Sequence, residues 1–129
     1  ITTPHVFSGV WDNNKEKITS NHEETLSVFS DNSNDVKLNA AAEYLLNDHF
    51  IELLNRNEIL TLKDNYVLVE MSYINPPIQL YDIIFKIQVA GYIPVLAHPE
   101  RYSFYHKSTD EYKKLKKSGC FFQLNLLYP

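Results

Sequence analysis

The chain has 129 residues, of which 44% are hydrophobic, and its formal net charge is -4. A chain of this size can bury the core of one domain but is too short for two. The acidic balance provides no basic field for nucleic acid, and no apolar run approaches the length of a bilayer-spanning helix. The single cysteine, Cys120, excludes an internal disulfide and suits a reducing compartment. We therefore expect a cytoplasmic protein that neither binds nucleic acid nor inserts into a membrane.

Apolar periodicity, turn residues and caps predict strands that alternate with helices along the whole chain. Strands are expected at residues 1–3, 36–46, 66–71, 93–97 and 120–126. Helices are expected at residues 15–29, 47–54, 78–90 and 108–118, with a polar turn at 30–35. Alternation at this spacing predicts an α/β fold with a parallel sheet and right-handed helical crossovers.

Several helix ends have recognisable signals. Asn13 or Asn14 could cap the first helix, because an asparagine side chain accepts a hydrogen bond from a free backbone N–H of the first turn. Ser108–Glu111 is a capping-box pattern that predicts the start of the last helix. Gly91 and Gly119 follow predicted helices, where glycine takes the left-handed conformation that ends a helix.

Polar side chains share one parity along the predicted strands. Both faces of an open doubly wound sheet lie under helices, so this polar content would be costly to bury there. In a barrel the same side chains point toward the mouth, where water, metal and substrate can satisfy them. We therefore expect a partial parallel (β/α) barrel. The residues of shared parity are Asn39, Glu43, Glu70, Ser72, His98, Gln123 and Asn125.

The stretch GYIPVLAHPERY, residues 91–102, combines a buried strand with chemically useful side chains. Its apolar run, 93–97, breaks directly into His98, and Arg101 follows three residues later. In parallel α/β folds the residues at the carboxyl end of a strand are where functional sites are usually built. This stretch therefore indicates a site at the end of the fourth predicted strand.

Three ionisable residues stand at or near the ends of different predicted strands: His5, Glu43 and His98. Since the carboxyl ends of parallel strands meet on one face, two imidazoles and a carboxylate could converge there on a divalent metal. Arg101 could then bind phosphate with its forked N–H groups. Each histidine taken alone is more often a hydrogen-bonded structural residue, and Arg101 alone favours a surface ion pair with Glu100.

Four motifs in order give the chain a resemblance to a known family. They are T-P-H at 3–5, A-A-A-E-Y at 40–44, P-V-L-A-H-P-E-R-Y at 94–102 and F-F-Q-L-N-L at 121–126. Together they resemble the bacterial PHP-type protein-tyrosine phosphatases, which serve capsular and exopolysaccharide biosynthesis. The similarity extends over the whole chain.

The resemblance implies a distorted (β/α)₇ barrel of the PHP superfamily, with a multinuclear metal centre at its mouth. It also implies that His5, Glu43 and His98 are metal ligands and that Arg101 is the catalytic residue that holds the substrate phosphate. The implied metal is Mn²⁺, or another divalent ion such as Fe, Mg, Co or Zn, and a metal-activated hydroxide would attack phosphorus. The implied partner is a tyrosine-phosphorylated protein, in particular a bacterial tyrosine kinase of polysaccharide export.

The family's barrel opens with a His-x-His motif and closes with an Asp-x-His motif, and this chain contains neither. We therefore expect residues 1–129 to be the central fragment of one PHP phosphatase domain, without the first strand and the late strands. Such a fragment would bind metal weakly and could be inactive alone. Its open strand edges predict self-association or pairing with the missing segments.

Two other functions remain open at this stage. The same fold could hydrolyse a small phosphate ester, as a histidinol phosphatase does, or the fragment could serve only as a binding module. Glu70 faces the expected interior and could pair with a neighbour or adjust the metal shell. Trp11 and Phe7 could stack on a tyrosyl ring, although packing is favoured for both. His22 and His49 are expected in solvent, and His106 could line the rim of the site.

Overall fold

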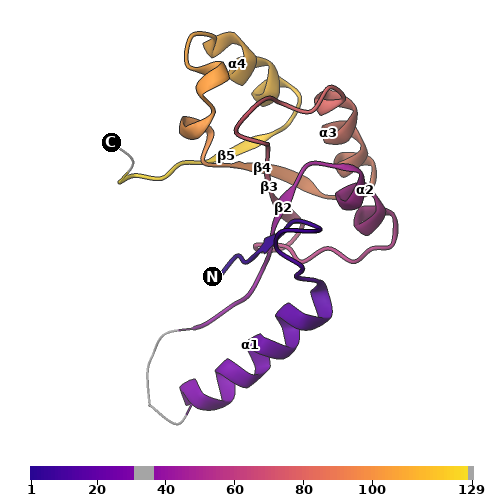
Figure 1. Cartoon of the computed structure of the whole chain (residues 1–129), viewed down its shortest axis with the longest axis vertical. Helices are drawn as coiled ribbons and strands as arrows, with labels where there is room; N and C mark the ends of the chain where they lie inside the picture. Colours follow the sequence, from indigo (N-terminus) through magenta and orange to yellow (C-terminus); the bar gives the residue numbers. More distant parts are fainter. Residues whose placement is uncertain (31–36, 128–129) are drawn as a thin grey trace.

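The computed structural model describes residues 1–30 and 37–127 of the chain (Figure 1). Within these residues, strands and helices alternate as expected. The strands are β1 (His5–Val6), β2 (Glu43–Leu45), β3 (Tyr66–Glu70), β4 (Ile93–Ala97) and β5 (Phe121–Gln123). The helices are α1 (Lys15–Ser30), α2 (Asp48–Asn55), α3 (Leu80–Val89) and α4 (Thr109–Lys117), with short 3₁₀ turns η1 (Pro99–Arg101) and η2 (Ser103–Tyr105).

The five strands form one parallel sheet in the order β1-β2-β3-β4-β5. Because helical crossovers in parallel sheets are right-handed, a sequential strand order places successive helices on the same face of the sheet. Figure 1 shows α2, α3 and α4 together on one side of β2–β5. The prediction of an α/β fold with a parallel sheet is confirmed, and the arrangement is consistent with a partial barrel.

The main core lies between the sheet and the helices that cover it. Val67 and Val69 of β3 and Ile84 and Ile87 of α3 are almost completely buried there. Full burial of such a side chain contributes about 1.5–3 kcal/mol relative to exposure. Alternate residues point to the opposite face, where polar side chains also gather. The small apolar cluster on that face consists of Leu68, Val95 and Ala97.

Three strands differ from the sequence prediction by more than one residue in their bounds. The extended run 36–46 contributes only Glu43–Leu45 to the sheet, and Ala40 makes an isolated bridge to Thr2. Apolar alternation detects extended backbone, whereas a strand also needs a neighbour that continues the ladder. The predicted first strand ends later than expected, since His5–Val6 is itself β1. The last strand spans Phe121–Gln123 instead of 120–126.

Most of the predicted helix ends are confirmed. The Asn14 side chain accepts a hydrogen bond from Lys17 N–H at 2.8 Å, so it caps α1. Gly91 and Gly119 have φ angles of 88° and 84° and follow α3 and α4. The capping box is wrong, because Ser108 precedes α4 but its side chain makes no capping hydrogen bond. The turn predicted at 30–35 lies almost entirely outside the described residues.

Helix α1 extends away from the rest of the molecule (Figure 1). Ile18 is its one buried apolar residue, whereas Leu26 and Val28 are exposed. The His22 ring nitrogen Nε2 lies 3.0 Å from the Leu38 carbonyl oxygen, so His22 joins α1 to the segment before β2 and is half-buried instead of fully solvated. In the described part of the chain no helix has the length and apolar character needed to cross a membrane.

Candidate metal centre

Four ionisable side chains that lie in, or directly after, the first four strands converge in one cluster. His5 is in β1 and pairs in register with Glu43 of β2. Glu70 is the last residue of β3, and His98 follows β4 directly. The parallel sheet therefore brings His5, Glu43 and His98 together, as the strand-end pattern predicts, and adds Glu70 to them.

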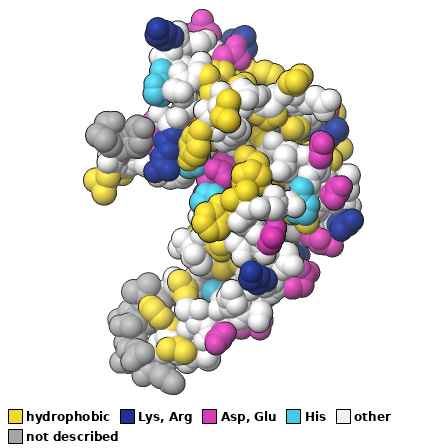
Figure 2. All heavy atoms as spheres, in the orientation of Figure 1, with side chains coloured by type: hydrophobic (Ala, Val, Ile, Leu, Met, Phe, Trp, Pro, Cys, Tyr) yellow, Lys and Arg dark blue, Asp and Glu magenta, His cyan; other side chains and the backbone are white. Residues whose placement is uncertain are grey.

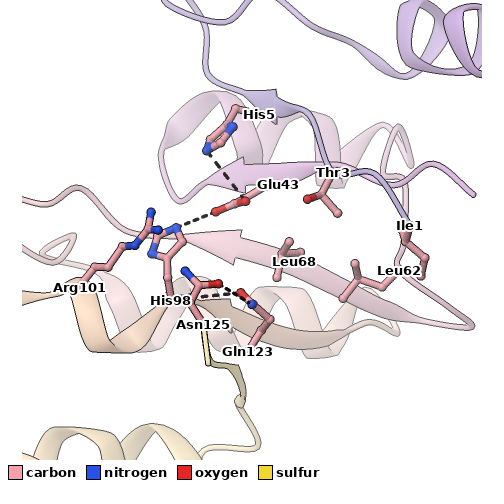
Figure 3. A pocket seen from close by; sticks show the side chains of 10 residues that line it. All are labelled: Ile1, Thr3, His5, Glu43, Leu62, Leu68, His98, Arg101, Gln123 and Asn125. Carbon is pink, nitrogen blue, oxygen red and sulfur yellow. Dashed lines mark hydrogen bonds and ion pairs between the residues drawn. The ribbon is translucent and has the colours of Figure 1, made fainter. Parts of the chain in front are cut away.

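Each glutamate lies between the two histidines. His98 Nε2 is 2.8 Å from Glu43 Oε1 and 3.5 Å from Glu70 Oε2. His5 Nε2 is 3.9 Å from Glu43 Oε2 and 3.8 Å from Glu70 Oε1. One ligand atom from each of His5, Glu43 and Glu70 lies within 4.8 Å of the other two. Figure 3 shows His5, Glu43 and His98 pointing toward one another from separate strands.

Burial makes this arrangement electrostatically demanding. Glu43, Glu70 and His98 are only 7%, 6% and 5% exposed. Burial alone would lower the pKa of His98, but hydrogen bonds and charge from Glu43 and Glu70 outweigh it and raise that pKa to about 9. The two buried carboxylates need a neighbouring positive charge to compensate them. Protonated His98 provides that charge here, and a bound metal cation would also provide it.

A sharp turn after β4 places Arg101 next to the cluster. His98 adopts a left-handed backbone conformation, with φ 35° and ψ 54°, which is strained for a residue other than glycine. Its carbonyl accepts a hydrogen bond from Arg101 N–H at 2.9 Å, which starts η1. His5, Glu43, His98 and Arg101 then line one cavity of about 370 Å³ together with Gln123. Figure 3 shows the Arg101 side chain beside His98.

Tyr102 stabilises this turn through two hydrogen bonds. The Tyr102 hydroxyl donates to the Ala97 carbonyl at 3.2 Å and accepts from Met71 N–H at 3.0 Å. This ring is completely buried, so it joins the ends of β3 and β4 beneath the cluster. In the described part of the chain both Glu100 carboxylate oxygens are buried and have no hydrogen-bond partner.

The donor set fits a divalent metal. Two imidazoles and two carboxylates are ligands that zinc, manganese and iron accept. The ligand atoms of His5, Glu43 and Glu70 lie close enough together to hold one ion, and His98 faces both carboxylates through Nε2. The structure therefore supports a metal-binding group at this position, and its chemistry does not select one ion.

Glu70 is the residue whose role the sequence left undecided. Its inward parity was visible from the run YVLVE, but nothing in that run says how far along the sheet the glutamate lies from Glu43 and His5. The register of β2 with β3, which pairs Leu45 with Glu70, supplies this information. His106 lies elsewhere: its ring bonds the Glu100 carbonyl and lines a separate apolar cavity.

The sequence as a whole matches a described family. Residues 1–127 match the profile of the capsular polysaccharide synthesis family CpsB/CapC. The chain belongs to the CpsB/CapC family. This agrees with the resemblance drawn from the four motifs, which lie in the same order along the matched region.

Relatives of this CpsB/CapC chain carry enzyme names. It is 29% identical over 126 residues to the tyrosine-protein phosphatase CpsB of Streptococcus pneumoniae, covering 97% of this chain and 52% of the relative. It is 26% identical over 102 residues to the tyrosine-protein phosphatase YwqE of Bacillus subtilis, covering 78% of this chain and 40% of the relative. The chain thus spans about half the length, or less, of these curated relatives.

A solved structure supports the fold of the CpsB/CapC chain. It superposes with a TM-score of 0.86 at 24% identity and covers 96% of this chain and 51% of the solved chain. That work describes YwqE from Bacillus subtilis and CpsB from Streptococcus pneumoniae as metal-dependent tyrosine phosphatases. At this identity the likeness establishes a shared fold, and the chemistry has to be argued from the site.

Proposed function

We propose that the protein is a metal-dependent phosphotyrosine protein phosphatase. The observation that carries this proposal is the buried cluster of His5, Glu43, Glu70 and His98, with Arg101 lining the same cavity. A cation-binding group beside a guanidinium is the combination that phosphate ester hydrolysis requires. The names of the relatives supply the substrate class.

The side chains of the site would have two separate roles, binding the cation and binding the substrate. His5, Glu43, Glu70 and His98 would hold the metal, and their carboxylates would compensate its charge. A bound divalent cation would supply Lewis acidity and a water activated near neutral pH. Arg101 would fork two N–H groups onto phosphate oxygens, which orients the ester and stabilises the charge that develops on those oxygens.

The proposed cofactor is Mn²⁺ in a multinuclear centre. Both Glu43 and Glu70 lie within 4 Å of both histidines, so the four side chains would hold the metal together. Neither glutamate is committed to one histidine alone. Further ligands would come from outside the 129 residues, as the length of the relatives suggests.

We also propose how this chain contributes to a larger barrel. Residues 1–129 would form the central part of a distorted (β/α)₇ PHP barrel that further strands close. Support comes from the sequential strand order and from the position of α2, α3 and α4 together on one side of the sheet (Figure 1). The partner would be a tyrosine-phosphorylated cytoplasmic protein, in particular a tyrosine kinase of polysaccharide export.

The test compares Glu70→Gln and Arg101→Ala in the protein that the gene encodes, loaded with Mn²⁺. We expect Glu70→Gln to weaken metal affinity by at least about 10–100-fold, because it removes a charged ligand. Arg101→Ala should retain metal and lower kcat/KM on a phosphotyrosine peptide by about 10²–10³-fold. Metal content is measured by elemental analysis and turnover by phosphate release.

Glu52→Gln is the matched control, since Glu52 is exposed on α2 and its carboxylate contacts only His49 among the ion pairs described. It should change neither readout. The proposal fails if the parent protein holds no stoichiometric metal, or if Glu70→Gln hydrolyses the peptide as fast as the parent protein.

A further inference from the structure

An apolar cavity of about 410 Å³ adjoins the cluster and shares His5 with the cavity that Arg101 and Gln123 line. Its walls include His5 and Glu70, so it shares two residues with the candidate metal centre. The remaining wall comes from two loops that follow β1 and β3 and is mostly apolar. Figure 2 shows hydrophobic side chains gathered next to histidine and acidic side chains in the hollow at the middle of the molecule.

Two aromatic rings in this wall lie against the two histidines. The Trp11 ring centroid is 6.2 Å from that of His5. The Tyr73 ring centroid is 5.6 Å from that of His98. The two rings come from different loops, and each one therefore borders one imidazole of the cluster.

Both rings are more exposed than packing requires. Trp11 is 56% exposed and Tyr73 is 51% exposed, and their neighbours Val10 and Ile74 are 59% and 85% exposed. Large apolar side chains clustered at the surface are typical of binding sites. Packing, which the sequence favours for both residues, therefore does not account for Trp11. Phe7 is half-buried.

The loop that carries Trp11 is held in shape by its own hydrogen bonds. Phe7 N–H donates to the Trp11 carbonyl at 3.1 Å, and Trp11 N–H donates to the Phe7 carbonyl at 2.7 Å. Gly9 at the tip has a φ of 80°, and its N–H donates to Asp12 Oδ1 at 2.8 Å. The wall is thus formed before any ligand arrives, which lowers the entropic cost of binding.

The cavity that Arg101 lines differs in chemistry. Arg101, Gln123 and Asn125 line it, as Figure 3 shows, and their donors suit phosphate oxygens. The cluster therefore borders one cavity with polar donors and a second cavity with aromatic rings. A ligand that matches both cavities has an anionic phosphate joined directly to an aromatic ring.

We propose that the cavity between Trp11 and Tyr73 binds the phenyl ring of phosphotyrosine and makes the site selective for aryl over alkyl phosphates. This inference rests on the proposed phosphatase function and adds the residues that determine specificity. The ring would make tilted or edge contacts with Trp11 and Tyr73, as aromatic pairs prefer. A phosphoserine or a small alkyl ester has no ring to occupy this cavity.

Binding can be measured without turnover, because Trp11 lines the cavity and the Trp11→Leu variant identifies its part of the fluorescence. The probes are phenylphosphonate and methylphosphonate, which carry the same anion and are not hydrolysed. In the Mn²⁺-loaded protein, phenylphosphonate should bind about tenfold more tightly, since one or two aromatic contacts supply that factor. Phenylphosphonate binding should also change the tryptophan fluorescence, and this change should be absent in Trp11→Leu. Tyr73→Ala should reduce the preference to less than about threefold.

The kinetic test measures kcat/KM for phenyl phosphate and for ethyl phosphate. Trp11→Ala and Tyr73→Ala should each lower the value for phenyl phosphate by about 3–10-fold and change the value for ethyl phosphate by less than about twofold. Trp11→Phe should restore most of the loss, because it keeps an aromatic ring. Phe85→Ala is the control, since Phe85 is an exposed aromatic residue on α3 outside the cavity.

Two results would overturn the inference and leave the phosphatase function intact. One is an equal affinity of the active parent protein for the two phosphonates. The other is an equal loss of kcat/KM on both esters in the Trp11 and Tyr73 variants. A parent protein that holds no metal and hydrolyses neither ester would instead overturn the proposed function, and the inference with it.

Discussion

His98 combines more constraints than any other residue of the site. Its ring bonds Glu43, its backbone is left-handed, and its N–H donates to the Gln123 side chain at 3.3 Å. A left-handed residue other than glycine costs about 1–2 kcal/mol, which the surrounding structure must offset. Strain of this kind is concentrated at functional sites, and here it aims an imidazole and starts the turn to Arg101.

A buried phenol gives a residue-scale prediction about pH. Tyr44 is 1% exposed, its oxygen accepts a hydrogen bond from Leu60 N–H, and burial raises its pKa from 10.0 to about 12. The folded state therefore keeps a proton that the unfolded state loses. The stability that this group contributes is fully present below pH 10.0 and is lost as the pH rises to about 12.

The measurement is urea unfolding at a series of alkaline pH values. Tyr44→Phe should remove roughly 2–3 kcal/mol of the decline in unfolding free energy over this interval. It should also cost about 1 kcal/mol at every pH, because Leu60 N–H loses its partner. Between about pH 7 and pH 9 the phenol is protonated in both states, so there the two proteins should show parallel curves. Parallel curves above pH 10 as well would contradict the assignment.

At the residue scale, the sequence predicts which residue types could form the site but not which of them lie next to one another. His5, Glu43 and His98 could be predicted because each lies in a strand or directly after one and its type suits a metal. Glu70 has the same type and position, yet its role depended on how far β3 advances along β2. Strand register is set by pairing partners remote in sequence, and no local pattern reports it.

At the scale of elements, two helices with the same cap should respond differently to its loss. Asn14 caps α1, and Asn47 caps α2 by accepting from Phe50 N–H at 2.9 Å. Helix α2 buries Phe50, Leu53 and Leu54 in the core, whereas α1 buries few side chains. Asn47→Ala should lower the global unfolding free energy by about 1 kcal/mol.

Asn14→Ala should leave the global value nearly unchanged and speed amide exchange in α1 alone, because loosely packed elements open locally. Native-state hydrogen exchange and urea unfolding separate the two effects. If Asn14→Ala lowers the global free energy as much as Asn47→Ala, then α1 is part of the cooperative core.

The elements themselves could largely be predicted, and their lengths could not. β3 and β4 are buried on both faces, so their apolar runs predicted them within a residue. The run 36–46 alternates just as well, but its neighbour β1 offers only His5–Val6 for pairing. A strand forms only where two segments of the chain pair, and the sequence of one segment does not report the length of its partner.

At the scale of the whole molecule, the sheet has two edges, β1 and β5, in the described part of the chain. Phe121 of β5 is 55% exposed, and Leu126 and Leu127 beyond it are 94% and 97% exposed. Unpaired backbone groups next to exposed apolar side chains are a template for pairing with another chain. The 129-residue chain should therefore self-associate as its concentration rises.

Sedimentation velocity over a range of concentrations tests this expectation. The double variant Leu126→Glu and Leu127→Glu should shift the chain toward monomer, because it adds charge at the edge. Val89→Glu, at an exposed position on α3, is the control and should leave the distribution unchanged. A chain that stays monomeric at every concentration, or an equal effect of the control, would rule out association through β5.

The sequential order of the strands also has a consequence during synthesis. Each strand pairs with the one made just before it, so a chain leaving the ribosome can extend the sheet one unit at a time. The four cluster residues emerge in the order His5, Glu43, Glu70 and His98, each in its own strand or directly after it. Nascent protein brings these four donors together only when β4 joins, and a cation captured at that stage would connect four successive units of the growing polypeptide.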